Sequence, residues 1–128
     1  MGKTYLAIDL GAESGRAILG RLEDGKLSTE EVHRFPNTTE SSTGRLRWDF
    51  PALMNNVHEG LSKAAARNGG QLDGIAVDSW GVDYGLLDED GQLLENPVHY
   101  RDEGHAGEAG RFTASIMSRE ELFSRTGV

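Results

Sequence analysis

Apolar residues gather in short runs in the first third of the chain, and small polar turns separate these runs. Residues 5–10 are almost continuously apolar and favour a buried strand, residues 16–22 favour a second strand, and residues 27–35 favour a third. The turns between them are a glycine-bounded segment at 11–15 and the hairpin signal Asp-Gly at 24–25. Three strands joined by such short turns predict an antiparallel meander.

The spacing of apolar residues becomes helical after residue 48. Asp49 suits a helix N-cap, and Pro51 suits the first turn, where a missing N–H is tolerated. Asn-Gly-Gly at 68–70 would end the helix. The apolar stripe that would face the core consists of Leu53, Val57, Leu61 and Ala64 or Ala65.

The segments on either side of this helix carry weaker patterns. Residues 36–44 are polar and rich in turn formers, which predicts a surface loop, and residues 45–48 suit a short strand. Residues 75–79 are rich in β-branched side chains and predict a strand, and residues 82–87 predict another. Asp-Gly at 90–91 then reverses the chain.

The C-terminal segment has local signals for one more helix. Ser118 and Glu121 have the spacing of a capping box, and Gly127 would end the helix that follows. The predicted order is therefore three strands, a helix, a further strand and a C-terminal helix. The order strand-strand-strand-helix-strand within it resembles the α/β half-domain of ribonuclease-H-like proteins, a mixed sheet with flanking helices.

Composition narrows the possible partners. The 128 residues suit one domain, and 13 Lys and Arg against 21 Asp and Glu give a net charge of −8. This charge disfavours nucleic acid, which is bound through basic side chains. The chain has no cysteine, which excludes disulfides and thiolate chemistry. No apolar run is long enough for a membrane span, and residues 1–10 do not read as a secretory signal, so we expect a cytoplasmic protein with no membrane partner.

The first candidate site is the turn between the first two strands. Asp9 ends the first strand and suits Mg²⁺, bound directly or through water. Gly11 and Gly15 would let backbone N–H groups approach phosphate oxygens, while Ser14 offers a hydroxyl and Arg16 a positive charge. The sequence contains no Walker A motif. From the residues alone, an ordinary glycine-rich hairpin with a surface aspartate is an equal alternative.

The second candidate site follows the strand predicted at 75–79. Trp80 offers an apolar wall, Gly81 permits close backbone approach, and Asp83 can accept hydrogen bonds from hydroxyls. Residues 100–102 form a second polar-aromatic group, although a charged surface at residues 101–103 is the alternative. The first cluster has its own alternative, in which the tryptophan is core and the aspartate caps a turn. The four histidines lack metal-ligand spacing, and His99 is expected to be a loop residue.

The residues at 8–16, Ile-Asp-Leu-Gly-Ala-Glu-Ser-Gly-Arg, resemble the first phosphate motif of the actin, heat-shock-70 and sugar-kinase superfamily. Within that superfamily the motif is similar to that of the FGGY carbohydrate kinases, and among these to that of the rhamnulokinase branch. The resemblance extends over essentially the whole chain. It continues through His33–Phe35, Trp48-Asp49, Asp78–Asp83, Pro97–Asp102 and Arg125–Gly127.

The resemblance implies a ribonuclease-H-like N-terminal half-domain that uses ATP and Mg²⁺, with the metal at Asp9. It implies that Gly81 lies in the substrate site. Glu13 departs from the small polar residue expected at its position. The residues that the resemblance places at the ATP phosphates are Ala12, Glu13, Ser14, Gly15 and Arg16. Three further substrate residues are inferred from their neighbourhood, namely Trp80, Asp83 and Arg101.

The resemblance also implies that residues 1–128 are an incomplete N-terminal domain. In the family, the catalytic base and most of the adenine pocket belong to later parts of the chain, so we expect these residues alone to be inactive. The parent enzyme would phosphorylate the ketose L-rhamnulose to L-rhamnulose 1-phosphate. Two alternatives are a metal-dependent nuclease that groups Asp9, Asp78 and Asp83, and a non-enzymatic actin-like ATP-binding domain.

Overall fold

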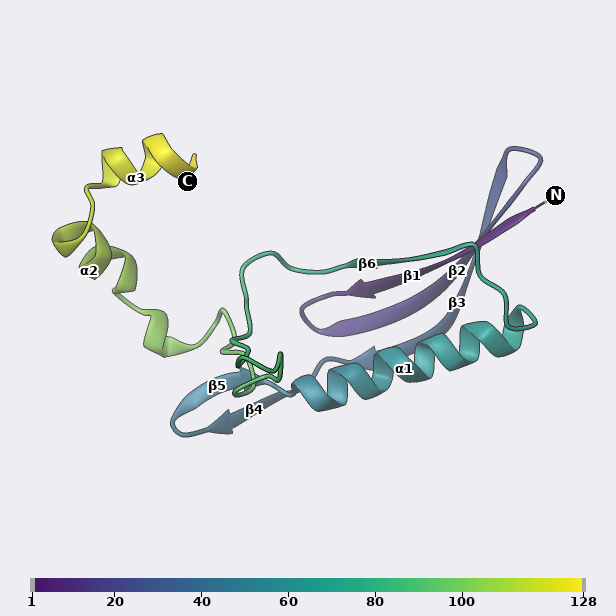
Figure 1. The fold of residues 1–128 in the computed structure, drawn as a ribbon, viewed down its shortest axis with the longest axis horizontal. Helices are drawn as coiled ribbons and strands as arrows, with labels where there is room; N and C mark the ends of the chain where they lie inside the picture. Colours follow the sequence, from purple (N-terminus) through teal and green to yellow (C-terminus); the bar gives the residue numbers. More distant parts are fainter. Residues whose placement is uncertain (1, 128) are drawn as a thin grey trace.

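A four-stranded sheet organises the computed structural model, which describes residues 2–127 (Figure 1). Its strand order is β3-β2-β1-β6. The strands β1 (Lys3–Leu10), β2 (Ser14–Glu23) and β3 (Lys26–Pro36) pair antiparallel in sequence order, which confirms the predicted meander. β6 (Gly74–Asp78) lies on the other side of β1 and runs parallel to it.

The second turn of the meander lies where the sequence predicted it, whereas the first turn is shorter than predicted. Asp24 and Gly25 have φ values of 49° and 75°, the left-handed pair that a two-residue hairpin turn requires, as predicted. The first turn is tighter than expected, because Ser14 and Gly15 already belong to β2. Only residues 11–13 connect β1 to β2.

Helix α1 (Phe50–Arg67) covers one face of the sheet (Figure 1). The predicted N-cap is confirmed, since Asp49 accepts a hydrogen bond from the Ala52 N–H at 3.0 Å. Gly60 lets the helix approach the sheet closely, because a Cβ at this position would lie 2.8 Å from the Ala17 Cβ. The buried core between helix and sheet consists of Leu6, Ile8, Ala17, Leu19 and Ala64.

β6 is an edge strand, and its apolar side chains are not covered by the described residues. Ile75 and Val77 are 56% and 62% exposed, although they share a face with the buried side chains of β1. On the opposite face of the sheet, Tyr5 of β1 is 43% exposed. Within residues 2–127 the sheet is therefore covered by a helix on one face, over β1 to β3.

A second hairpin precedes α1, and the loop predicted at residues 36–44 is wrong in part. β4 (Thr39–Ser42) pairs antiparallel with β5 (Arg45–Trp48) through a turn at Thr43 and Gly44, whose φ values are 53° and 74°. β4 is short and polar, so its composition is typical of a loop. Pairing with β5 supplies the backbone partners that make it a strand.

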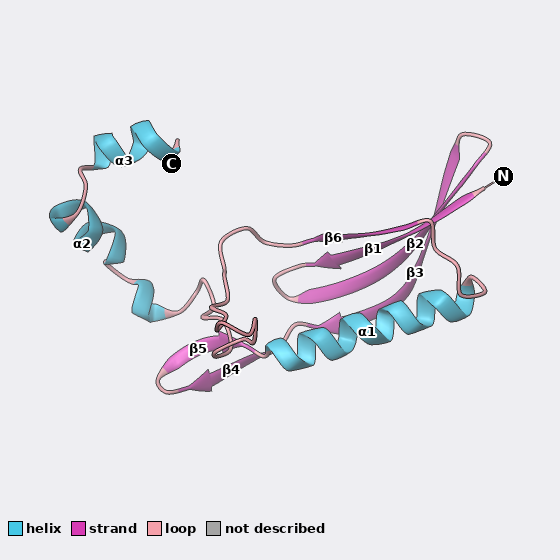
Figure 2. Cartoon of the chain, viewed as in Figure 1, coloured by secondary structure: helices cyan, strands magenta, loops and turns pink. Residues whose placement is uncertain are grey.

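The strand predicted at residues 82–87 is also wrong. The chain leaves the sheet after Asp78 and forms a long loop, the pink segment beyond β6 in Figure 2. Only Leu87 forms a bridge there, with Leu93, across the predicted reversal, where Gly91 has φ 76°. The apolar residues of this segment meet no neighbouring strand, so their alternation cannot produce a ladder.

The end of this loop is held along β5. The Trp48 N–H donates to the Pro97 carbonyl at 2.9 Å, and the His99 N–H donates to the Leu46 carbonyl at 2.9 Å. The buried Arg47 guanidinium donates to a carbonyl of the same loop. The loop is therefore ordered by a strand that lies about 50 residues earlier in the chain.

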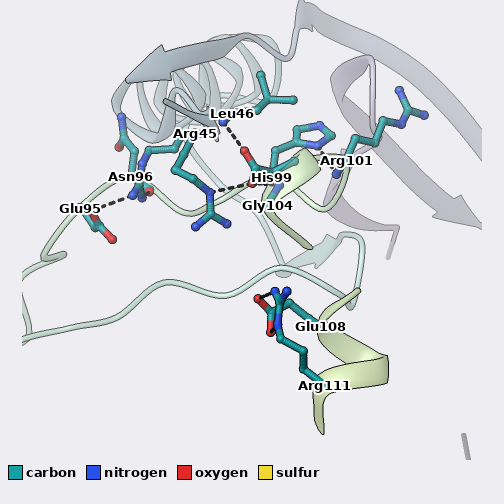
Figure 3. Close-up of polar contacts among 11 residues, drawn as sticks. Arg45, Leu46, Glu95, Asn96, His99, Arg101, Gly104, Glu108 and Arg111 are labelled. Atoms are coloured by element: carbon teal, nitrogen blue, oxygen red, sulfur yellow. Dashed lines mark hydrogen bonds and ion pairs between the residues drawn. The ribbon is translucent and has the colours of Figure 1, made fainter. Parts of the chain in front are cut away.

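The buried carboxylate of Asp102 also attaches the end of this loop to β5. The residue is 6% exposed, and its carboxylate accepts hydrogen bonds from Arg45 Nε at 2.7 Å, Leu46 N at 2.5 Å and Gly104 N at 2.9 Å. Figure 3 shows Arg45, Leu46 and Gly104 gathered at this point. The Leu46 N–H, assisted by the Arg45 guanidinium, lowers the pKa of Asp102. Asp102 is therefore a structural carboxylate, and the charged-surface interpretation is wrong for this residue.

Three short helical elements follow and project away from the sheet (Figure 1). They are η1 (Glu103–His105), α2 (Glu108–Ser115) and α3 (Arg119–Thr126), of which only α3 was predicted. The Ser118 hydroxyl accepts from the Glu121 N–H at 3.1 Å, and Gly127 ends α3 with φ 77°, both as expected. Among the described residues, no helix combines the length and apolarity needed to cross a membrane.

We predict that Asp102→Asn lowers the thermal unfolding midpoint at pH 7. An uncharged amide has only one acceptor oxygen, so it cannot replace the carboxylate that accepts from both Arg45 and the Leu46 N–H. The pKa of Asp102 is lowered by folding. Its stabilising contribution is therefore present above the unfolded-state pKa of about 4 and is lost as the pH falls through the folded-state value. The difference in midpoint between wild type and variant should shrink below about pH 4.

Asp24→Asn is the matched control, since it makes the same chemical change in an exposed turn. Asn tolerates the φ of 49° there, so the midpoint should not fall. A difference in unfolding midpoint between wild type and Asp102→Asn that stays constant from pH 7 to pH 3 would contradict a stabilising role for the charged Asp102 carboxylate.

Candidate functional site

A row of four charged residues crosses the sheet where β1 and β6 end. Asp9 is in register with Asp78 of β6 on one side and with Arg16 of β2 on the other, and Arg16 is in register with Arg34 of β3. Residues in register on neighbouring strands direct their side chains to the same face. Asp9 and Arg16 form an ion pair in which both side chains remain about one-third exposed (32% and 39%). The row offers carboxylates for a cation beside guanidinium groups for an anion.

The tip of the first turn adjoins this row. Ala12 and Glu13 are exposed, and their backbone N–H groups have no backbone partner among the described residues. The Gly11 N–H donates to the Ser14 carbonyl at 3.1 Å and closes the turn. Free N–H groups in a tight turn suit the oxygens of a phosphate.

Gly15 has a packing role that the sequence did not indicate. It is buried, and a Cβ at this position would lie 2.2 Å from Cζ of the Phe35 ring. The glycine is therefore required by packing within the chain. Any contact between Gly15 and a phosphate would use its backbone alone.

The second cluster is centred on Trp48, which is 3% exposed. Its ring stacks on Trp80 with centroids 4.4 Å apart, and its Nε1–H donates to Asp83 Oδ2 at 2.5 Å. The predicted residues Trp80 and Asp83 are thus brought together by a tryptophan 32 and 35 positions earlier in the sequence. Trp48 was quoted only as part of the resemblance, and no local signal marks it as the centre of this cluster.

His99 is the other residue of this cluster that the sequence did not single out. It is 4% exposed and packs on Trp48 with ring centroids 4.1 Å apart, so it is part of the interior. Burial lowers the pKa of His99; the Asp83 carboxylate opposes this and Arg101 reinforces it. The Arg101 N–H donates to His99 Nδ1 at 2.9 Å, which places the proton of the neutral ring on Nε2. The Arg101 guanidinium lies over the Tyr100 ring, 5.1 Å from its centroid.

Two hollows border this cluster. One of about 200 Å³ is lined by Trp48, Trp80 and Asp83 and by Leu10, whose side chain is on the opposite face of β1 from Asp9. Another of about 370 Å³ lies between Asp83 and β5. A Cβ added at Gly81 would meet no atom within 4 Å, so the space beside this glycine is open.

The residues at the first turn fit Mg²⁺ and a polyphosphate. Among the described residues, no three His, Asp or Glu side chains are grouped to hold a metal. Mg²⁺ needs no such group, because it takes one or two carboxylates and completes its shell with substrate phosphates and water. Asp9 beside the free N–H groups of the tip meets this requirement. The structure does not support the nuclease alternative, because Asp83 is hydrogen-bonded to Trp48 and is not grouped with Asp9 and Asp78.

Comparisons with known proteins identify relatives over the whole chain. Rhamnulokinase of Bacteroides thetaiotaomicron is 42% identical over 128 residues, and rhamnulokinase of Enterococcus faecalis is 42% identical over 127. The matches cover 100% and 98% of this chain but 26% and 25% of the two relatives. The chain therefore spans about a quarter of the length of these relatives.

Solved structures show the same fold. Gluconate kinase from Lactobacillus acidophilus superimposes with a TM-score of 0.79 at 16% identity, covering 100% of this chain and 25% of that structure. Xylulose kinase from Rhodospirillum rubrum gives 0.73 at 24% identity, covering 94% and 25%. The predicted α/β half-domain of the actin, heat-shock-70 and sugar-kinase fold is confirmed. The model of the "FGGY family of carbohydrate kinases, N-terminal domain" matches residues 4–128, and the chain belongs to this family.

Proposed function

We propose that the chain is the N-terminal part of a longer ATP-dependent kinase that phosphorylates L-rhamnulose to L-rhamnulose 1-phosphate. The observation that carries the proposal is that β1 and β6 run parallel and are in register at Asp9 and Asp78, where both strands end. The turn suited to phosphate and the aromatic residues suited to a sugar therefore leave the sheet at the same edge. The rhamnulokinase relatives, which match over nearly the entire chain, support the choice of sugar.

In this proposal the first turn binds the phosphates of ATP. The N–H groups at the exposed tip contact phosphate oxygens, and Arg16 leaves its pair with Asp9 to contribute positive charge. Asp9 holds Mg²⁺, directly or through water. When bound, Mg²⁺ supplies charge compensation at the phosphates. The residues assigned to ATP are Ala12, Glu13, Ser14, Gly15 and Arg16.

The sugar site lies at the aromatic cluster. Trp80, held in place by its stacking on Trp48, presents a flat surface to C–H groups of the ketose. Asp83 keeps one oxygen on Trp48 and can accept from a sugar hydroxyl with the other. Gly81 gives the ketose access to the backbone, and Arg101 lies at the border of the site over Tyr100.

The reaction transfers the γ-phosphoryl group of ATP to the primary hydroxyl of the ketose, which releases ADP and one proton. Phosphoryl transfer depends mainly on in-line positioning and charge stabilisation. These residues contribute positioning of both substrates. The base that takes the proton and the rest of the nucleotide site are assigned to the remainder of the longer protein, so residues 1–128 alone should be inactive.

The test of the proposal is a coupled ADP-release assay on the full-length protein with a panel of ketoses and aldoses. L-rhamnulose should give the highest kcat/KM and should require ATP and Mg²⁺. A preference for a different sugar would overturn the substrate assignment. Absence of sugar-dependent ADP release with every sugar would overturn the kinase assignment.

We predict that Gly81→Val raises the KM for the ketose about tenfold, which corresponds to about 1.4 kcal/mol of lost binding. The new side chain meets open space in the protein, so it obstructs the ligand and not the fold. The KM for ATP should stay within about twofold, which steady-state kinetics with each substrate varied in turn will measure.

Gly110→Ala is the matched control for this variant, because its Cβ also meets no atom within 4 Å but lies in α2. It should leave both KM values unchanged. The sugar-site assignment fails if Gly81→Val weakens ATP as much as the ketose.

We predict that Asp9→Asn lowers kcat between about tenfold and a hundredfold, the range seen when groups that orient a bound metal are removed. The amide retains the size of the side chain but loses the charge that would attract Mg²⁺. The Mg²⁺ concentration that gives half-maximal rate should rise, while the KM for the ketose should change little.

Asp24→Asn again provides the control, since the hairpin at Asp24 and Gly25 connects the ends of β2 and β3 that lie away from Asp9. It should keep the wild-type kcat and Mg²⁺ dependence. Equal Mg²⁺ dependence in Asp9→Asn and wild type would show that Asp9 has no role at the metal.

A further inference from the structure

The turn between β1 and β2 is held from outside by Asn37, the first residue after β3. The Asn37 backbone N–H donates to the Glu13 carbonyl at 3.0 Å, and its side-chain Nδ2–H donates to the Gly11 carbonyl. These two carbonyls lie on either side of the two-residue tip. We propose that Asn37 is a positioning residue that fixes the turn in the geometry required to bind the ATP phosphates, an inference that rests on the proposed function.

The effect follows from the planarity of the peptide group. In a trans peptide the carbonyl of one residue and the N–H of the next point in opposite directions. Holding the Gly11 carbonyl therefore fixes the direction of the Ala12 N–H, and holding the Glu13 carbonyl fixes that of the Ser14 N–H. The peptide groups on both sides of the tip are oriented before a ligand arrives, which lowers the entropic cost of binding.

Asn37 is itself held by the chain on both sides. Pro36, whose φ is restricted by its ring, is in register with Ser14. The Thr38 carbonyl accepts from the Asp49 N–H at 3.0 Å, which ties this segment to the residue that caps α1. The amide is therefore anchored to the sheet and to the start of the helix, so it can restrain the turn.

The side chain of Asn37 is poorly suited to a purely structural role. Its Oδ1 atom is buried and has no hydrogen-bond partner among the described residues. A buried oxygen without a partner opposes folding, and this offsets what the Nδ2 bond contributes to stability. Removing the side chain should therefore affect the turn much more than the stability of the protein.

The experiment measures ligand binding directly in the full-length protein. Calorimetry without sugar should show that Asn37→Ala binds ATP about tenfold more weakly than wild type, a loss of about 1.4 kcal/mol. The Kd for the ketose should stay within about twofold, and the unfolding midpoint without ligand should be unchanged. Amide hydrogen exchange of the segment 9–16 in the ligand-free protein should become faster.

Two further variants test the cause. Asn37→Asp keeps the shape of the side chain but lacks the Nδ2–H donor, so it should bind ATP at least as weakly as Asn37→Ala. Thr38→Ala changes the exposed neighbouring side chain and keeps the backbone bond to Asp49, so it should match wild type.

The outcomes separate this inference from the proposed function. A wild-type protein that binds no ATP overturns the proposed function and the inference together. Wild-type ATP affinity in Asn37→Ala or Asn37→Asp overturns the inference alone. A parallel loss of ATP, ketose and thermal stability in Asn37→Ala would show a merely structural residue and also overturns the inference.

Discussion

The register of β1 is the constraint on which the rest of the structure depends. Successive residues of a strand point to opposite faces, so a single register assigns Leu6 and Ile8 to the helix-covered core and Asp9 to the other face. The same register sets Asp9 between an acidic residue of β6 and a basic residue of β2. A slip by one residue would bury the aspartate and expose the core. Core and candidate phosphate site are therefore specified together.

A bulge in β3 extends this arrangement across the sheet. The pairing of β2 with β3 shifts between Ala17 and Ile18, which leaves one extra residue in β3. Residues three apart in a regular strand face opposite sides, yet Arg34 pairs with Glu31 at 2.6 Å because the bulge lies between them. Arg34 consequently stands beside Arg16 at the end of the charged row.

The sugar side of the site depends on a different kind of contact. Residues 79–102 form a loop that is ordered by hydrogen bonds to β5 and by the buried carboxylate of Asp102. Trp48, the last residue of β5, belongs both to that attachment and to the wall of the hollow. Burial lowers the pKa of the neighbouring His99 although the Asp83 carboxylate opposes this shift, so the ring is neutral. Trp48 therefore both attaches the loop to β5 and lines the hollow.

The sequence by itself determined the meander, α1, the cap of α3 and the two motifs, because alternation, turn residues and capping are properties of neighbouring positions. Only the tertiary structure decided that residues 39–42 are a strand, that residues 82–87 are not one, and that Trp48 and His99 pack together in the second cluster. These outcomes depend on contacts between distant positions, such as Trp48 with Asp83 and Leu46 with Asp102, which lie 35 and 56 residues apart. A local pattern carries no information about which distant backbone will supply a hydrogen bond.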